Sequence, residues 1–203
     1  MICFLILSTG ENNFKKLPVL TEGVPEFNTI SNKVVLKNNV SVICFLGNNL
    51  NDVKSGVFNL NEKIYKKFID YNNFQIVAIY PKENESDVLA FKEDLGEYTD
   101  MKKWRFVAAD EKEIQNFFNG LSVKTSLENL GLARAFIIDK NLNLRGRSND
   151  KDFPDGRLEA YNLNSVSEIK SKMKDDINVL FYEYYAAFKK RNQNKADRKE
   201  VGL

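Results

Sequence analysis

The sequence of 203 residues predicts a single α/β domain of three layers, in which helices flank a central mixed sheet and a long helix ends the chain. Three observations indicate this fold class. Short apolar runs rich in β-branched residues alternate with stretches in which apolar residues recur every three or four positions. Two further apolar runs are joined by a tight turn, which predicts an antiparallel hairpin. A last amphipathic stretch, from about Ser165 to Arg191, predicts the long C-terminal helix.

Two segments precede the main strands. Residues 15–27 are predicted to be extended, because Pro18 and Pro25 each disfavour helix in the residue before them. Residues 30–36 alternate weakly between apolar and polar side chains and predict a short hairpin.

The next stretch predicts the corner at which a site would form. Val40–Leu46 is an apolar strand, Gly47 breaks it, and a polar loop leads into a helix over Asp52–Tyr71. A strand, a loop and a helix in this order build the active-site corner of many α/β proteins. This loop has no thiol, no histidine and no phosphate-binding glycine pattern.

The remaining elements alternate along the chain. We expect strands at Phe74–Tyr80 and Trp104–Ala108, helices at Asp87–Leu95 and Glu111–Phe118, loops at 82–86 and Lys151–Arg157, and the hairpin at Ala135–Ile138 and Leu142–Arg147. A terminal hairpin followed by a helix is typical of the thioredoxin-like version of a three-layer sheet.

Composition excludes several classes of function. The formal net charge of +2 is too balanced to favour nucleic acid as a partner. The chain contains no histidine, which removes the commonest general base and the commonest nitrogen ligand for copper, zinc or iron. Its two cysteines, Cys3 and Cys44, have no nearby partner thiol, and Cys44 is predicted to be a small buried hydrophobe in its strand. Trp104 begins an apolar strand and is predicted to lie in the core.

The ends of the chain are predicted to differ from the domain at 15–191. Residues 1–14 contain the apolar run Ile2–Leu7, too short to span a bilayer, followed by small residues, as at the end of a secretory signal. LILSTG resembles a lipoprotein lipobox in which Thr9 replaces the cysteine. We expect export to the bacterial cell envelope and membrane association through a clipped signal or anchor; a native first strand or a frayed tail is the alternative. Residues 192–203 form a basic tail.

The segments of the chain together resemble the Sco/SenC family, thioredoxin-fold proteins that handle copper during cytochrome oxidase assembly. The resemblance covers about residues 15–190 and rests on KLPVL, the corner at Val40–Phe68, FQIVAIYPKENES, KWRFVAADEKEI and FIIDKNLNLRG. It implies a thioredoxin-like fold and a role near respiratory oxidase assembly or copper homeostasis.

The positions that hold copper in that family carry other residues here. Sco proteins place C-x-x-x-C-P after the first core strand and a histidine before a late strand. Alignment by the strand puts Asn49 and Val53 at the cysteine positions, alignment by the helix puts Leu50 and Lys54 there, and the histidine position falls near Gly131 and Leu132. Copper(I) favours thiolate and imidazole, so we expect no copper, no other cofactor and no thiol redox activity.

Polar side chains remain at the corner. They are Asn48, Asn49, Asn51 and Asp52, with Arg134 expected opposite them. One interpretation is helix capping by Asn51 or Asp52 together with turn formation. The other is a residual cleft, in which amides of the helix N-terminus and Arg134 bind an anion or a peptide carboxylate.

Two functions therefore remain open. The first is a non-catalytic Sco-like protein of the envelope that binds an unidentified protein partner. The second is an enzyme or metal carrier with an unrecognised site outside the corner. The first is favoured, because the loop has no thiol and the chain has no histidine, so the usual reactive groups of this fold are missing.

Overall fold

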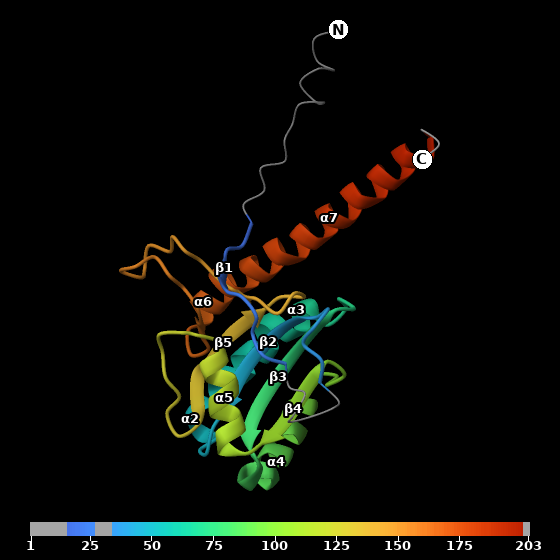
Figure 1. Cartoon of the computed structure of the whole chain (residues 1–203). Helices are drawn as coiled ribbons and strands as arrows, with labels where there is room; N and C mark the ends of the chain where they lie inside the picture. The colour runs from blue at the N-terminus through green and yellow to red at the C-terminus, as the bar shows by residue number, and fades with distance from the viewer. Residues whose placement is uncertain (1–15, 27–33, 201–203) are drawn as a thin grey trace.

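The computed structural model describes residues 16–26 and 34–200 and confirms a three-layer α/β fold (Figure 1). Within these residues one mixed sheet has seven strands, in the order β1-β6-β5-β2-β3-β4, with β7 paired to β5. The strands are β1 (Val19–Thr21), β2 (Val40–Leu46), β3 (Phe74–Pro81), β4 (Trp104–Ala109), β5 (Gly131–Ile138), β6 (Leu144–Arg145) and β7 (Tyr161–Asn162). β2, β3 and β4 are parallel, and β5 runs antiparallel to β2.

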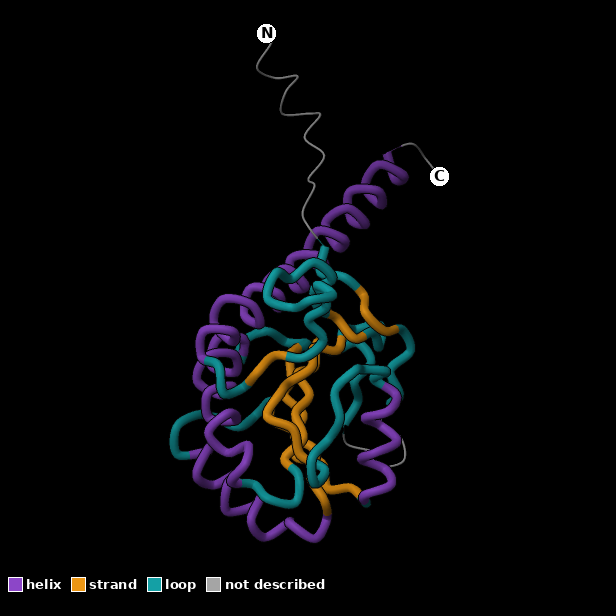
Figure 2. The backbone as a smooth tube through the Cα atoms, turned by 90° about the vertical axis from the view of Figure 1, so that its left-hand side faces the viewer, coloured by secondary structure: helices purple, strands orange, loops and turns teal. Residues whose placement is uncertain are grey.

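Helices cover both faces of the sheet, which lies between them in Figure 2. They are α2 (Asn51–Leu60), α3 (Lys66–Phe68), α4 (Glu85–Gly96), α5 (Glu111–Gly120), α6 (Val166–Glu168) and α7 (Lys174–Glu200). π-helical turns at Asn61–Tyr65 and Ile169–Met173 join α2 to α3 and α6 to α7. The alternation of β2 separates two cores: Val42 and Cys44 face α2, α4 and the C-terminal helix, whereas Ile43 and Phe45 face α5.

Several predicted elements are confirmed with shifted ends. The strands predicted at 74–80 and 104–108 each continue for one more residue, and Trp104 is buried in the core as expected. The predicted helix over Asp52–Tyr71 is a helical run that ends at Phe68. The predicted loop at 82–86 is instead a 3-10 turn followed by the first residues of α4, so this prediction was wrong.

The late hairpin differs more from its prediction. β5 begins at Gly131 rather than at Ala135, and β6 contains only Leu144 and Arg145. A bulge explains the difference at β5, because Cys44 pairs with Ala135 while the next residue, Phe45, pairs with Leu132. The two extra residues interrupt the alternation by which a strand is recognised in sequence.

Other segments differ from their predictions or lie outside the described residues. The short strand β1 lies in the segment predicted only as extended, and β7 was not predicted. Residues 30–33 of the expected hairpin and the expected signal segment 1–14 lie outside the described residues, and 34–36 form no strand. The C-terminal helix reaches Glu200, beyond the predicted end at Arg191.

A buried ion-pair cluster fastens the C-terminal helix to the sheet. Arg145 Nη1 lies 2.8 Å from Asp139 Oδ2, and Arg145 Nη2 lies 2.7 Å from Glu183 Oε2 on α7. Arg145 Nε also donates to the carbonyl of Leu17, ahead of β1, at 2.9 Å. Among the described helices none is both long and apolar enough to cross a membrane.

Candidate functional site

The corner is formed where the carboxyl end of β2 meets the first residue of β5. Gly47 has a φ of +69°, and a Cβ atom added there would lie 2.6 Å from Gly131 Cα. The backbones of these two residues therefore touch, and a side chain at Gly47 would have to displace backbone rather than a flexible side chain. This approach places the start of α2 beside the start of β5.

A tight turn closes the corner below this contact. Glu128 and Gly131 exchange backbone hydrogen bonds of 2.9 and 2.8 Å, and the two residues between them, Asn129 and Leu130, have φ values of 48° and 63°. Both lie in the left-handed region, which asparagine tolerates but leucine adopts at a cost. The carbonyl of Asn129 accepts a hydrogen bond from the amide of Asn48 at 2.8 Å, which ties the turn to the loop after β2.

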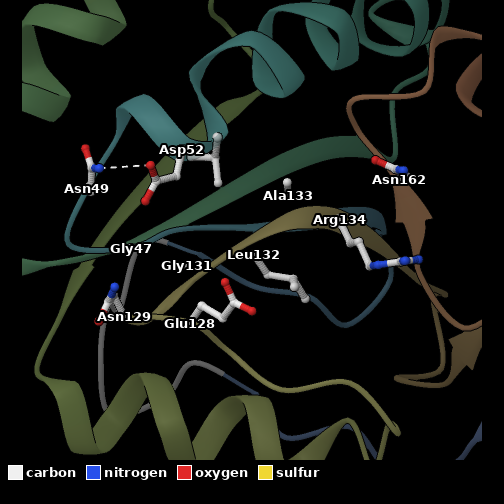
Figure 3. A pocket seen from close by; sticks show the side chains of 11 residues that line it. Gly47, Asn49, Asp52, Glu128, Asn129, Gly131, Leu132, Ala133, Arg134 and Asn162 are labelled. Atoms are coloured by element: carbon white, nitrogen blue, oxygen red, sulfur yellow. Dashed lines mark hydrogen bonds between the residues drawn. The ribbon is translucent and has the colours of Figure 1, made fainter.

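An open depression of about 260 Å³ lies between these segments (Figure 3). It is lined by Gly47, Asn49, Asp52, Val53, Glu128, Asn129, Gly131, Leu132, Ala133, Arg134 and Asn162. Asp52 from α2 and Glu128 from the turn lie on opposite sides of it, and Arg134 and Asn162 lie together at one end. Both signs of charge therefore line the depression, with amide side chains between them.

The structure brings together only some of the residues expected at this site. Asn49, Asp52 and Arg134 line the depression as predicted, and so do Val53, Gly131 and Leu132, which stand at positions aligned with family copper ligands. The others expected there do not line it: they are Asn48, Leu50, Asn51 and Lys54.

Each of those four residues has another place. The side chains of Asn48 and Asn51 are exposed, and Leu50 packs against the core. Lys54 Nζ lies 2.9 Å from Asp94 Oδ2 of α4. These four side chains therefore serve the loop and the α2–α4 contact rather than the depression.

The predicted caps of α2 are wrong. The helix begins at Asn51, and neither Asn51 nor Asp52 accepts a capping hydrogen bond. The N-cap is Leu50, which has no capping side chain. Asn49, one residue earlier, braces the turn instead: its Oδ1 accepts from the Asn51 amide at 3.3 Å, and its Nδ2 donates to Asp52 Oδ1 at 2.9 Å. The prediction failed because several adjacent Asn and Asp residues have similar capping preference. Which of them lies at the start of the helix depends on the backbone conformation of the loop.

The amides at the start of α2 already have acceptors, which weakens the anion-binding interpretation. The amide of Asp52 donates to the Asn49 carbonyl at 3.2 Å, and those of Val53 and Lys54 donate to the Leu50 carbonyl at 3.2 and 2.9 Å. The carboxylate of Asp52 also stands beside them. An anion at this corner would therefore depend on Arg134.

Arg134 lies in the bulge of β5, opposite Asn162 of β7. Its Nη1 donates to the Ala160 carbonyl at 3.4 Å, and no carboxylate within the described part of the chain forms an ion pair with it. The same side chain also lines a neighbouring depression of about 270 Å³ beside Lys124, Phe153 and Glu159. The guanidinium is thus placed to meet a ligand that extends across either depression.

Sequence reasoning missed four side chains of the site: Glu128, Asn129, Ala133 and Asn162. The pair Asn129-Leu130 before a glycine carried a weak turn signal. Asn162 carried none, because β7 is two residues long and reaches the corner only through its pairing with β5.

The donor set does not fit copper or thiol chemistry. Cys44, as predicted, is fully buried within β2, and burial raises the pKa of its thiol to about 12. In the described residues no cluster of three or more His, Cys, Asp or Glu side chains could hold a metal ion. Asn49 and Val53 in the depression offer neither thiolate nor imidazole, the ligands that copper(I) favours.

Comparisons with known proteins identify the fold. No protein-family model and no curated protein sequence matches the chain. The solution structure of a "putative protein disulfide isomerase" from Bacteroides thetaiotaomicron is similar, with 18% identity, a TM-score of 0.56, and coverage of 86% of this chain and 99% of that one. BsSco, described as a member of the Sco family of cytochrome c oxidase assembly proteins, has 16% identity, a TM-score of 0.53, and coverage of 81% and 96%. The chain therefore has a thioredoxin-like fold of the kind that BsSco shares.

Proposed function

We propose that this protein is a non-catalytic, Sco-like accessory protein of the bacterial envelope, which binds a polypeptide partner at the corner depression. The observation that carries the proposal is the depression itself. It opens where a thioredoxin-like protein has its reactive loop, yet the polar side chains of its lining are three amides, two carboxylates and one guanidinium. Such a lining suits the recognition of polar groups, and it offers no thiol, hydroxyl or imidazole for catalysis.

The chemistry of the lining favours a peptide segment. The side chains of Asn49, Asn129 and Asn162 can each donate and accept hydrogen bonds, as a peptide backbone requires. Arg134 suits a carboxylate, and Asp52 with Glu128 suits a lysine or an amino terminus.

The size of the depression points the same way. Pockets for small molecules usually enclose about 300–1,000 Å³ and bury most of the ligand. This depression holds about 260 Å³ and is open on one side. An extended chain passing over it would place one or two side chains inside and leave the rest on the surface.

The envelope location and the link to oxidase assembly rest on the resemblance to Sco proteins. The first residues suggest export and association with a membrane. A role in respiratory oxidase assembly or copper homeostasis, without copper bound by this chain, is the accessory function that this resemblance favours.

Site-specific photocrosslinking tests the proposed surface. A photoreactive phenylalanine analogue replaces Leu132 in the depression or, as the control, Tyr98, which is 61% exposed and lies outside it. In envelope fractions we expect the analogue at position 132 to crosslink to a few discrete proteins. The analogue at position 98 should crosslink to none of those proteins. Equal crosslinking at both positions would contradict the proposal.

A charge variant then tests the recognition. Arg134→Glu should weaken binding of the purified crosslinked partner by at least about tenfold, because it replaces a charge-assisted hydrogen bond by repulsion. The matched control is Lys67→Glu, an exposed cation on α3. Equal affinities for wild type and Arg134→Glu would refute the use of this depression.

A copper titration separates the proposal from the alternative of a metal carrier. The purified protein is titrated with Cu(I) in competition with a chromophoric chelator, and insulin reduction is assayed in parallel. We expect neither stoichiometric copper binding nor reductase activity. Tight binding of one copper per chain would instead establish a carrier with a site outside the family positions.

A further inference from the structure

A second depression lies at the opposite end of the parallel strands and is basic. It holds about 410 Å³ and is lined by Val35, Asn39, Asn72, Phe74, Gln75, Lys102, Lys103 and Arg105. Three of these side chains are cationic, and none of these lining residues is acidic. The corner site, by contrast, has two carboxylates and one cation.

The topology explains why these residues meet. Strands β2, β3 and β4 run parallel from Val40, Phe74 and Trp104, so the turns before them share one end of the sheet. Those turns supply Asn39, Asn72, Lys102 and Lys103 to the depression. Residues far apart in the chain thereby form one surface.

Gln75, one member of a buried polar pair, lines the depression. Ser41 and Gln75 are neighbours across β2 and β3 at positions where the alternation faces the α5 side of the sheet. Gln75 Nε2 donates to Ser41 Oγ and to the Val35 carbonyl, each at 2.9 Å. Both donors of this amide are used within the protein, so recognition of a ligand would fall to the cations.

Backbone carbonyls hold two of the cations, Lys103 and Arg105, in place. Arg105 Nη1 donates to the carbonyls of Lys102 and Trp104 at 2.8 and 3.0 Å, and Lys103 Nζ donates to the Tyr71 carbonyl. In the part of the chain that the structure describes, neither Lys103 nor Arg105 forms an ion pair with a carboxylate.

The three cations of the depression outnumber the acids beside them. Lys102 Nζ is 3.5 Å from Asp100 Oδ2. Burial and the charges of Lys102 and Arg105 lower the pKa of Lys103, which Asp70 only partly offsets. Three cations are thus gathered at one concave surface with only Asp70 and Asp100 beside them, and an anion would stabilise the positive charge that is left over.

We propose that this basic depression binds a small polyanion, a molecule that carries either linked phosphates or several carboxylates. Two lysines supply point charges, and the guanidinium of Arg105 can pair with two oxygens at once. The depression is wide enough for a ligand of a few linked acidic groups. This site is separate from the corner and does not depend on the function proposed for it.

Calorimetric titration of the full chain at low ionic strength tests the proposal. The probes are pyrophosphate and citrate, which distinguish phosphate from carboxylate ligands, with sodium chloride of equal ionic strength as the blank. We expect one of them to bind with a Kd below about 1 mM. Weaker binding of both probes would overturn the proposal, because it would reflect only general screening of surface charge.

Two matched double variants locate the binding. Lys102→Gln with Arg105→Gln should weaken binding at least about tenfold, since charge-assisted hydrogen bonds are lost. Lys67→Gln with Lys112→Gln removes the same net charge from exposed positions outside the depression and should leave the Kd within about twofold. Equal weakening in both variants would overturn the proposal.

A measurement on the wild-type protein guards against misfolding of the variants. In a 15N-labelled sample, the probe should shift the amide resonances of Asn72, Gln75 and Lys102–Arg105 and leave those of Asn49 and Gly131 unmoved. Shifts confined to the corner, or spread over the whole surface, would contradict the proposed site.

Discussion

Replacing Gly47 with alanine should destabilise the protein more than the same replacement at Gly23. The two glycines have nearly the same backbone conformation, with φ values of +69° and +70°. They differ in their surroundings. A Cβ atom at Gly23 would meet nothing within 4 Å, whereas one at Gly47 would lie 2.6 Å from Gly131 N and 2.9 Å from the Asn129 carbonyl oxygen.

The magnitudes follow from these two terms. An L-residue in the left-handed region costs about 1–2 kcal/mol, which is the whole cost expected for Gly23→Ala. Overpacking against structure that cannot move aside costs about 1–3 kcal/mol more, so Gly47→Ala should lose about 2–5 kcal/mol in total. The difference between the variants isolates the contact between the two backbones of the corner.

Urea denaturation followed by fluorescence measures both values. Trp104 is the single tryptophan of the chain and is 4% exposed, so its emission reports the loss of the core. Hydrogen exchange of the Asn48 and Gly131 amides adds a local readout, because their bonds to the turn should open first in Gly47→Ala. Equal losses of unfolding free energy in the two alanine variants would refute the close approach at the corner.

Two further predictions concern ionisable groups. Burial opposes ionisation of Asp150, but the hydrogen bonds from Lys172 and the Asp152 amide, together with the charges of Lys172 and Arg147, outweigh it and lower the carboxyl pKa below the usual 3.8. Asp150 therefore adds stability above about pH 4 that is lost as the pH falls through the lowered pKa. Asp150→Asn should therefore lower the unfolding free energy by about 2 kcal/mol at pH 7 and flatten its decline in acid, as urea denaturation at several pH values would show; an unchanged acid slope would contradict this. In a Cys3→Ser variant, Cys44 should react with a disulfide reagent at pH 8 only as fast as the protein opens, because burial raises its thiol pKa to about 12; labelling as fast as in urea would show that the thiol is accessible.

Much of the fold could be predicted because many of its strands and helices have a signal within a few consecutive residues. The runs at 74–80 and 104–108 are apolar except for Gln75 and Arg105, so their place in the sheet followed from composition. The capping box of α5, between Asp110 and Glu113, lies within four consecutive residues and agrees with the predicted start of that helix. The missed elements, β1 and β7, are too short to show a period.

The candidate site was predicted less completely. Asn49, Asp52 and Arg134 were expected at the corner and line it, since two of them follow a strand and the third precedes the hairpin. Glu128 and Asn162 were not expected. They reach the depression through a turn and a two-residue strand whose positions depend on pairing with β5.

The sequence by itself determined what chemistry the corner lacks, because a residue type that is absent from the chain or the loop cannot be supplied by folding. It contains no histidine, and its loop after β2 contains no thiol. Only the tertiary structure decided what the corner holds instead. The bulge that shifts β5 against β2, the contact of Gly47 with Gly131 and the arrival of Asn162 each depend on residues distant in the chain. Strand pairing over such distances is set by packing of the whole sheet, and a local pattern of apolar residues does not record it.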